Sequence, residues 1–451
     1  MSWKDSLPAS AKAYIGERQL DEVECIISDF PGVARGKAVP ASKFAKQEHF
    51  YLPNSIFLQT LTGEWAEAAG EEGWVEPDMT LRPDLDTATA APWATDATLQ
   101  VIHDAKDQQG NLVPYSPRNV LRRVIERYDA LGLKPIIAPE LEFFLVQKNT
   151  DPDFPLQPPA GRNGRPETAR QSYSIDAVNE FDPILDLMYD YCEAMELDVD
   201  TLIHESGAAQ LEINFIHADP LSRADQVFLF KRTVRAVAKQ HGVYATFMAN
   251  PMAGQPGSAM HIHQSVVDAE TGRNLFSNAN GKDSALFRSY IAGLVKFMPQ
   301  ISPLWAPNVN SFRRMRPDSA APIIVQWGED NRSCGFRVPI SDKANRRVEN
   351  RLPGADSNPY LAMAASLVCG YIGMVERMVP AKAITGSAYN RARTLPRTLE
   401  AALDRFSACK PVRNLLGEEF FDIFYAVKDY ELFNYQSVVS SWEREHLLLR
   451  V

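Results

Sequence analysis

One stretch, residues 135–146, constrains the fold more than any other part of the chain. It reads Pro-Ile-Ile-Ala-Pro-Glu-Leu-Glu-Phe-Phe-Leu-Val, which has the length and apolar content of a buried strand. Glu140 and Glu142 lie two residues apart, so on a strand both carboxylates point to the same face. A buried carboxylate is costly unless it is neutralised, paired or bound to a metal, and no Lys or Arg lies beside these two. The stretch therefore predicts two acids facing a metal-binding cavity, with an exposed edge strand as the alternative.

Three further stretches alternate polar and apolar residues in the same way. The residues that share a polar face are Gln210, Glu212 and Asn214; His261, His263 and Ser265; and Arg347, Glu349 and Arg351, with Glu205 just upstream of the first set. A half-buried strand with a solvated polar face explains any one of these stretches. Four such strands in one chain favour the inside of a curved sheet that holds ions and a charged substrate.

Composition narrows the class of protein. The chain has 451 residues, enough for two or three domains and a large core. Its net charge of −10 argues against a nucleic-acid-binding surface. The five cysteines have no CxxC or paired spacing and are expected to be free thiols in a reducing compartment. The N-terminal sequence lacks the apolar core of a signal peptide, and the apolar run 361–375 is short for a membrane span. These features predict a cytoplasmic enzyme or assembly rather than a secreted or membrane protein.

The order of elements suggests two domains. Strand candidates at 23–29, near Lys37, at 78–83 and at 98–104 predict a small, mostly β domain over 15–113, with a loop at 52–70. Ser116 as N-cap and Pro117 at the first helical position predict a helix that opens a second domain, 114–451. The expected helices in that domain cover about 180–196, 223–241, 284–299, 358–378, 396–408 and 417–449, and the expected long loops are 149–171 and 304–318.

The polar residues on these strands form an oxygen-rich ligand set. Five carboxylates and one imidazole favour Mg²⁺ or Mn²⁺ over zinc or copper, and six ligands are enough for two ions: Glu140, Glu142, Glu205, Glu212, Glu349 and His261. Several cationic residues follow them, namely Arg314, Arg332, Arg337, Lys343, Arg347 and Arg351. Acids, metal ions and arginines in one cavity suit phosphoryl transfer. The chain has neither a P-loop nor the protein-kinase signatures, so a nucleotide must bind in another way.

In combination, five motifs resemble those of class I glutamine synthetases. They are Pro-Glu-Leu-Glu-Phe-Phe from Pro139, His204-Glu205 with Gln210-Leu-Glu212, Gly-Ser-Ala-Met-His-Ile-His from Gly257, Asn331-Arg-Ser, and Arg-Arg-Val-Glu-Asn-Arg from Arg346. The resemblance covers nearly the whole chain. It implies an α+β fold: a small N-terminal β-grasp-like domain and a C-terminal catalytic domain whose antiparallel, funnel-shaped sheet is flanked by helices. It also implies a dodecamer of two hexameric rings, with active sites shared between neighbouring subunits.

The resemblance also implies a role for individual residues. Glu142, Glu205 and Glu212 match the ligands of one metal ion, and Glu140, His261 and Glu349 match those of a second. Nucleotide-binding positions match His263, Ser265, Arg337 and Lys343, with Arg347 near them. Gly257, Arg314 and Arg351 match positions that hold glutamate, and Arg332 matches a residue placed on the transferred phosphoryl group. The implied reaction makes γ-glutamyl phosphate from ATP and glutamate, after which an amine displaces phosphate.

Departures from the family pattern bear on which amine is used. Glutamine synthetases surround ammonium with an Asp and a Glu, but here the Glu position is Ala320 and residues 52–60 lack the Asp-Gly-Ser-Ser loop. Losing two carboxylates should weaken the capture of ammonium and opens space for an alkyl amine. The residues expected to line such a slot are Phe57, Leu58, Trp65 and Trp327, although Phe57 and Trp327 are more simply explained as core. Pro256 is a third departure, because the family usually has Asn there, beside the glutamate.

These departures, and the tail 442–448, are similar to the γ-glutamylpolyamine (γ-glutamylputrescine) synthetase branch, whose members open polyamine breakdown. The predicted function is therefore ligation of glutamate to putrescine or a longer polyamine. Two alternatives stay open: a glutamine synthetase with a divergent ammonium site, and a catalytically inactive structural relative. The sequence does not choose among polyamines. It offers only Glu64 and Asp318 as acids for the distal ammonium, and Tyr389, near a position that some family members modify, is expected to be a plain surface residue.

Overall fold

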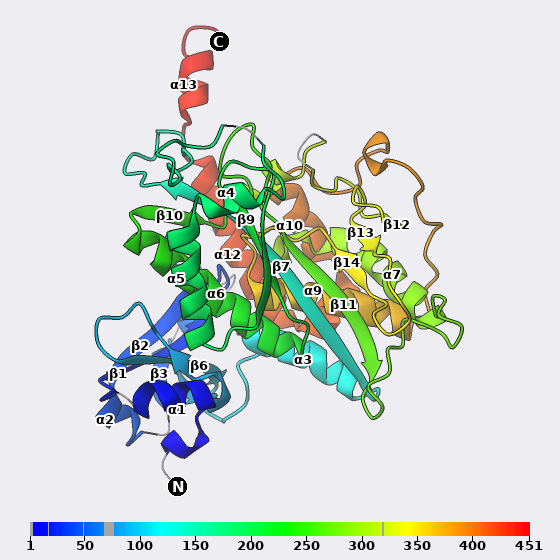
Figure 1. The fold of residues 1–451 in the computed structure, drawn as a ribbon. Helices are drawn as coiled ribbons and strands as arrows, with labels where there is room; N and C mark the ends of the chain where they lie inside the picture. Colours follow the sequence, from blue (N-terminus) through cyan, green and yellow to red (C-terminus); the bar gives the residue numbers. More distant parts are fainter. Residues whose placement is uncertain (1–2, 17, 48, 67–75, 169, 318–319) are drawn as a thin grey trace.

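The chain folds into two β-sheets with helices packed around them (Figure 1). The computed structural model describes residues 3–16, 18–47, 49–66, 76–168, 170–317 and 320–451. The smaller sheet is built from the N-terminal part of the chain, and the larger sheet from residues after 130. The fold is α+β, as predicted.

The N-terminal sheet has the order β2-β1-β6-β4-β3, and β5 also pairs with β6. Its strands are β1 (Glu22–Ser28), β2 (Ala34–Pro40), β3 (Phe50–Pro53), β4 (Asp78–Pro83), β5 (Thr89–Ala90) and β6 (Thr98–Lys106). β1 pairs in parallel with β6, and the other pairs are antiparallel. The expected strands are present. The expected loop at 52–70 is wrong at its start, because β3 and the 3-10 helix Asn54–Leu58 occupy that stretch and bury Phe57 and Leu58.

The larger sheet carries the polar strands predicted from the sequence. Its order is β12-β13-β14-β11-β7-β9-β8, with β10 also paired to β7, and all pairs except β12–β13 are antiparallel. The strands are β7 (Leu133–Gln147), β8 (Val199–His204), β9 (Gln210–Phe215), β10 (Val243–Thr246), β11 (Met260–Asp268), β12 (Trp327–Glu329), β13 (Phe336–Val338) and β14 (Val348–Asn350). β7 and β11 run side by side along the middle of the molecule (Figure 1).

Helices pack against this sheet and close its apolar side. They include α3 (Pro117–Asp129), α5 (Asp182–Ala194), α6 (Pro220–Gln240), α7 (Ala285–Phe297) and α9 (Pro359–Val375). α3 begins at Pro117, whose fixed φ suits the first helical turn, but the Ser116 side chain makes no capping hydrogen bond, contrary to expectation. α9 is almost wholly buried, as expected for its apolar sequence, and Asn358 caps it by accepting from the N–H groups of Tyr360 and Leu361. Over the described residues, no helix has the length and apolarity needed to cross a membrane.

The C-terminal part is helical but more interrupted than predicted. α10 (Leu399–Ala408), α11 (Lys410–Leu416) and α12 (Glu418–Gln436) pack on the body, and α13 (Ser441–Leu447) projects away from it (Figure 1). The single helix expected over 417–449 is therefore wrong, because Ser440 and Glu443 form a capping box that starts a separate helix. Within 304–318, expected to be a loop, α8 (Ser311–Arg314) forms one turn.

The described chain also contains the shorter α-helices α1 (Ala9–Gly16), α2 (Ala41–Phe44) and α4 (Ile175–Asn179). The five cysteines are all free and buried, as the absence of paired spacing predicted.

Candidate active site

Strand register brings the predicted ligands together. Antiparallel pairing places Glu140 of β7 opposite His261 of β11, and Glu142 opposite Glu212 of β9. Directly opposed residues on neighbouring strands point to one face of the sheet. β14 adds Glu349 opposite His263 on the other side of β11. The expectation that separate polar strands share one wall is therefore met by the geometry.

The first cluster consists of Glu142, Glu205 and Glu212. Their ligand oxygens lie within 4.8 Å of one another, although Glu205 comes from the turn after β8 rather than from a strand. Glu142 and Glu212 are buried, and burial followed by the charges of neighbouring carboxylates raises the pKa of both. A bound cation would offset the repulsion among three carboxylates at this separation and favour their ionised forms. Their oxygen-only chemistry fits a hard divalent ion such as Mg²⁺ or Mn²⁺.

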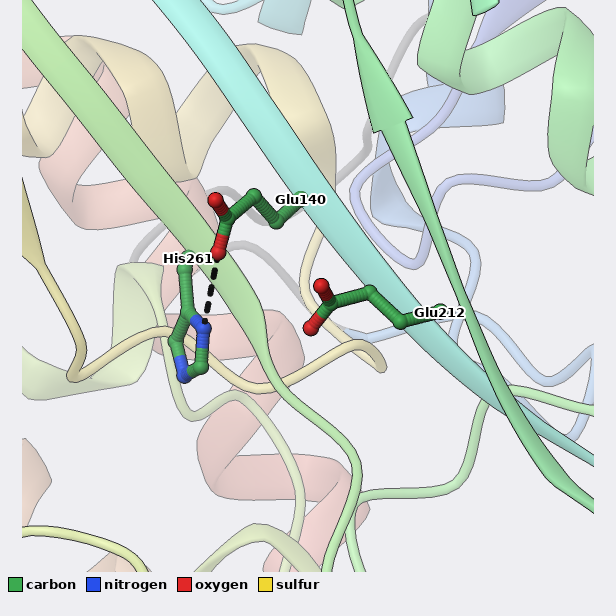
Figure 2. Close-up of side chains that lie close together, drawn as sticks. All are labelled: Glu140, Glu212 and His261. Atoms are coloured by element: carbon green, nitrogen blue, oxygen red, sulfur yellow. Dashed lines mark ion pairs between the residues drawn. The ribbon is translucent and has the colours of Figure 1, made fainter. Parts of the chain in front are cut away.

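The second cluster centres on Glu140 (Figure 2). Its Oε2 lies 3.4 Å from Nδ1 of His261, and Glu140, Glu212 and His261 have ligand atoms within 4.8 Å of one another. Burial raises the pKa of Glu140, but its contacts with His261 and His263 outweigh burial and lower it. Burial lowers the pKa of His261 to about 4, which leaves this imidazole neutral and able to bind a metal. Glu349, the third predicted ligand of this group, has an oxygen 3.8 Å from the same Nδ1.

Glu349 is held by two arginines. Nη1 of Arg337 donates to its Oε2 at 2.7 Å, and Nη1 of Arg351 forms an ion pair with its Oε1. Arg337 also bonds Asp330, across 2.7 Å, so its guanidinium is fixed between two acids. The Nε atom of Arg351 is buried and has no partner within the described residues. That unused donor is the kind of group that a bound anionic ligand would satisfy.

A hydrogen-bonded chain links Arg347 to Glu140 through His263. Nε of Arg347 donates to Nδ1 of His263 at 3.1 Å, so the ring proton lies on Nε2, which donates to Oε1 of Glu140 at 2.8 Å. His263, Ser265 and Arg347 line a cavity of about 700 Å³ that opens beside β11. Lys343, a fourth residue predicted to bind nucleotide, is exposed on the loop before β14 and is not among the residues that line this cavity.

The predicted glutamate residues also meet. Arg314 is buried, and its Nη1 and Nη2 donate to the carbonyl oxygens of Leu352 and Arg351 at 2.8 and 3.0 Å. A Cβ atom on Gly257 would lie 2.5 Å from Cγ of Arg314, so only glycine allows this contact. Both residues line a second cavity of about 250 Å³, which also contains all six predicted metal ligands, Arg332, Arg337 and Arg351. Arg332 is exposed at its rim.

One wall of this smaller cavity was only partly foreseen. Ala320 and Pro256 line it, as the departures from the family pattern suggested, together with Tyr173, Ile203 and Ser206, to which no role was assigned. Tyr173 and Ala320 have positive φ values of 62° and 59°, an uncommon conformation for residues other than glycine. Asp318 falls outside the described residues.

The expected apolar slot does not form in this cavity. Of the residues that the structure describes, those lining it do not include Phe57, Leu58, Trp65 or Trp327. Phe57 packs against Phe30 and Tyr115 in the core, and Nε1 of Trp327 donates to the Ala381 carbonyl oxygen at 2.8 Å, so the simpler interpretation of both as core residues is correct. Glu64 faces Thr62 and Asn434.

Two further residues depart from their expected roles. Tyr389 is half-buried beside Ile323, Ile324 and Cys334 rather than a plain surface tyrosine, and burial raises its pKa. His217, to which no role was assigned, lines the 700 Å³ cavity together with Asp200 and Asn274. Its position five residues after Glu212, just beyond the end of β9, is the signal that could have placed it there.

Comparison with known proteins places this geometry in a family. The family model described as glutamine synthetase, catalytic domain, matches residues 114–447. Gamma-glutamylputrescine synthetase PuuA of Escherichia coli K12 is 35% identical over 434 residues, which cover 94% of this chain and 91% of that protein. Glutamate–isopropylamine ligase of a Pseudomonas species is 32% identical over 95% of both chains. Glutamine synthetase of Pyrococcus abyssi is 31% identical over 94% of this chain and 92% of its own.

Solved structures agree with the sequence matches. The structure described as apo GmaS without ligand superposes with a TM-score of 0.81 at 26% identity, covering 98% of this chain and 99% of GmaS. A complex of GmaS with ADP superposes with a TM-score of 0.80 at the same identity, covering 97% of this chain and 99% of that one.

Proposed function

The chain belongs to the glutamine synthetase family, and we propose that it uses ATP to ligate the γ-carboxylate of glutamate to an amino group of putrescine or another polyamine. Relatives in this family include a gamma-glutamylputrescine synthetase, a glutamate–isopropylamine ligase and glutamine synthetases, so their names share a glutamate–amine ligation and differ in the amine. The proposal therefore depends on the side of the cavity that would meet the amine.

The composition of that wall is the observation that carries the proposal. The carboxylates that line the cavity all belong to the two ligand clusters or to the Arg-paired Glu349. The lining also includes Tyr173, Ile203, Pro256, Ala320 and Ala321, which we take as the wall for the amine, beside the polar Ser206 and Gln210. A site for ammonium needs a negative group near the nitrogen, whereas this wall offers apolar surface that suits the methylene chain of an alkyl amine.

The same cavity offers the groups that the first step needs. Gly257, Arg314 and Arg351 would hold glutamate, with the free Nε of Arg351 as an available donor. The γ-carboxylate oxygen attacks the γ-phosphorus of ATP, which forms γ-glutamyl phosphate and releases ADP. Arg332 at the rim and Arg337 beside Glu349 would offset the charge on the transferred phosphoryl group.

Divalent ions fit the two ligand clusters. Glu142, Glu205 and Glu212 would hold one ion, and Glu140, His261 and Glu349 a second. Bound Mg²⁺ or Mn²⁺ would neutralise phosphate charge and orient the reacting oxygens. ATP would lie in the adjoining 700 Å³ cavity. This cavity shares Glu140 with the 250 Å³ cavity and is lined by His263, Ser265 and Arg347. Arg337 of β13 and Lys343 of the loop before β14 would meet the ATP phosphates.

In the second step the amine nitrogen attacks the carbonyl carbon of γ-glutamyl phosphate. Phosphate leaves with the electrons of the broken C–O bond, and the nitrogen loses a proton to become the amide. The amine attacks as the neutral base, because an ammonium nitrogen has no free electron pair. The proton that the nitrogen loses after the attack would pass to the leaving phosphate, since Ala320 brings no carboxylate to this wall.

An assay of ADP release across an amine panel tests the proposal. Purified protein with ATP, Mg²⁺ and glutamate is given putrescine, cadaverine, spermidine, spermine, isopropylamine and ammonia, and each amide is identified by mass spectrometry. The proposal expects the highest kcat/KM with a polyamine. Efficient use of ammonia alone would instead identify a glutamine synthetase. Failure to bind Mg²⁺-ATP in calorimetry would identify an inactive relative.

We also propose the ring assembly that the family resemblance implies. Light scattering during gel filtration should then give about twelve times the chain mass of 50.4 kDa. A mass of one or two chains would contradict it.

A further inference from the structure

Residues 160–168 and 170–173, here called the strap, are fastened to the turn that carries Glu205. The strap closes on itself through a bridge between Ala160 and Pro166. At its end, the N–H of Tyr173 donates to the carbonyl oxygen of His204 at 2.9 Å, and the hydroxyls of Ser172 and Ser206 lie 2.7 Å apart. The last residue of β8 and the turn after it are thus held from outside the sheet.

The strongest attachment is the side chain of Glu167, which is only 6% exposed. Its Oε2 accepts from the backbone N–H of Ala209 at 2.7 Å, and the same oxygen lies 3.0 Å from Nε2 of His204. One carboxylate from the strap therefore reaches both ends of the 205–209 turn. A buried carboxylate that accepts from a backbone N–H and an imidazole makes stronger contacts than a neutral group would.

The His204 ring connects Glu167 to the backbone of Glu205. Its ring is fully buried, and Nδ1 lies 2.7 Å from the carbonyl oxygen of Glu205, which can only accept. Nδ1 must therefore carry a proton, and Nε2 faces the Glu167 carboxylate. The imidazole thus bridges the strap carboxylate and the backbone of a ligand residue.

The turn itself is conformationally demanding. Ala209 has a φ of 55°, in the left-handed region that residues other than glycine seldom adopt. A Cβ atom on Gly207 would lie 2.5 Å from the ring of Phe144, so the turn also packs tightly on β7. Such a conformation persists only where surrounding contacts fix it, and Glu167 supplies one at the Ala209 N–H.

We propose that Glu167 is a positioning residue that couples docking of the strap to cation binding at Glu142, Glu205 and Glu212. This inference rests on the proposed function only in treating those three carboxylates as a cation site. Docking the strap fixes the turn with Glu205 facing its partners, and it places Tyr173 in the wall of the 250 Å³ cavity. Because coupling between two sites is reciprocal, a bound cation must also favour the docked strap.

Trypsin cleavage with Mn²⁺ as the probe tests the coupling directly. Arg162 and Arg170 are exposed on the strap, so a strap that undocks should be cut after either residue. Saturating Mn²⁺ should slow cleavage at Arg170 about tenfold in the wild-type protein. In Glu167→Gln, Mn²⁺ should slow cleavage less than about twofold, because docking of the strap no longer depends on the bound cation.

Glu180→Gln is the matched control. Glu180 is also a carboxylate that fastens the strap, since its Oε2 accepts from the N–H of Asn163 at 2.8 Å, but it has no hydrogen bond to the 205–209 turn. Mn²⁺ should therefore protect Glu180→Gln as it protects the wild-type protein. Equal protection of Glu167→Gln, or no protection of the wild-type protein, would overturn the proposal.

Mn²⁺ affinity provides a second readout that does not depend on catalysis. Electron paramagnetic resonance titration should show about tenfold weaker binding at one site in Glu167→Gln, with Glu180→Gln unchanged. If Glu167→Gln also melts earlier in the absence of metal, Ser172→Ala replaces it, since this exposed residue loses only the contact with Ser206. It should show a smaller loss of Mn²⁺ protection, and full protection would contradict the coupling. Wild-type protein that binds Mn²⁺ but forms no amide would refute the ligase proposal and leave the coupling intact.

Discussion

A single side chain, Ala320, is expected to decide between ammonia and larger amines. It lines the cavity at the position that the family resemblance aligns with the Glu of an ammonium site, and no carboxylate outside the ligand clusters and Glu349 lines the cavity among the described residues. Ala320→Glu should raise kcat/KM for ammonia about tenfold, which corresponds to about 1.4 kcal/mol of added stabilisation of a cationic nitrogen. It should lower kcat/KM for putrescine by a similar factor, because the longer side chain fills the space of the methylene chain.

Ala320→Gln separates charge from size in the same steady-state assay. It should lower putrescine use as Glu does, without the gain with ammonia. If Ala320→Glu leaves the ratio of the two substrates unchanged, this wall does not select the amine.

The carboxylate cluster should make metal activation depend on pH. Burial, and then neighbouring negative charge, raises the pKa of Glu142 and Glu212 above the ordinary range, so protons compete with the cation at pH values where exposed carboxylates have lost them. As pH falls from 8 to 6, the Mg²⁺ concentration for half-maximal activity should therefore rise. Titrations of ADP release against free Mg²⁺ at each pH check this. A constant half-activating concentration across that range would show that the cluster stays ionised without the cation.

Among the elements, α7 and α9 form a contact with little tolerance for added volume. The two helices meet at glycines: a Cβ atom on Gly293 would lie 2.1 Å from the Cys369 carbonyl oxygen, and one on Gly373 would lie 2.2 Å from that of Ser289. Gly293→Ala should therefore lower the free energy of unfolding by about 1–3 kcal/mol or more, because backbone atoms cannot move aside as a flexible side chain would.

Gly16→Ala is the control for that substitution. Gly16 lies in α1, and a Cβ atom there would meet nothing within 4 Å. Alanine should be neutral or should stabilise the helix by up to about 1 kcal/mol. Urea unfolding of both variants measures the difference, and equal stabilities would mean that α7 and α9 separate at little cost.

The strands were easier to predict than the connections between them. Residues 135–146 were identified as a strand with two inward acids because alternation with a period of two is local, and β7 has this geometry. The strap gave no such signal. Its Pro, Gly and charged residues predicted only a loop, whereas the contacts of Glu167 depend on a turn more than thirty residues later in the chain. The break between α12 and α13 was not predicted. Ser440 and Glu443 can start a new helix as a capping box only if the preceding helix has already ended.

At the scale of the whole molecule, the site depends on strand order, which no local pattern contains. The order β14-β11-β7-β9-β8 brings ligands from residues 140 to 349 around one cavity. The roles of these residues were predicted from the resemblance of their motifs to those of the family, and not from the geometry of the site. Tyr173 and Ile203 could not be recognised in advance, because their positions in the wall depend on how the strap and β8 fold over it.

One buried guanidinium links the N-terminal sheet to two helices of the rest of the molecule, in addition to contacts such as the ion pair of Arg232 with Glu24. Arg118 of α3 bonds Asp84 after β4 at 2.7 Å, Asp104 of β6 at 2.5 Å and Asp225 of α6 at 2.8 Å. Tyr360 of α9 donates to the same Asp225 at 2.6 Å. The predicted division into 15–113 and 114–451 remains a prediction, and this network crosses it.

Arg118→Leu would test that division. It leaves Asp225 buried without its cation, which should cost about 3–5 kcal/mol, and it also releases the two acids on the N-terminal side. We expect calorimetry to resolve a separate, earlier transition for the N-terminal sheet. Arg162→Leu removes an exposed pair with Asp182 instead and should change stability by less than about 1 kcal/mol. A single transition for Arg118→Leu, at the temperature of the wild-type protein, would mean that contacts other than those of Arg118 hold the N-terminal sheet in place, because its charged network could then be removed without loss.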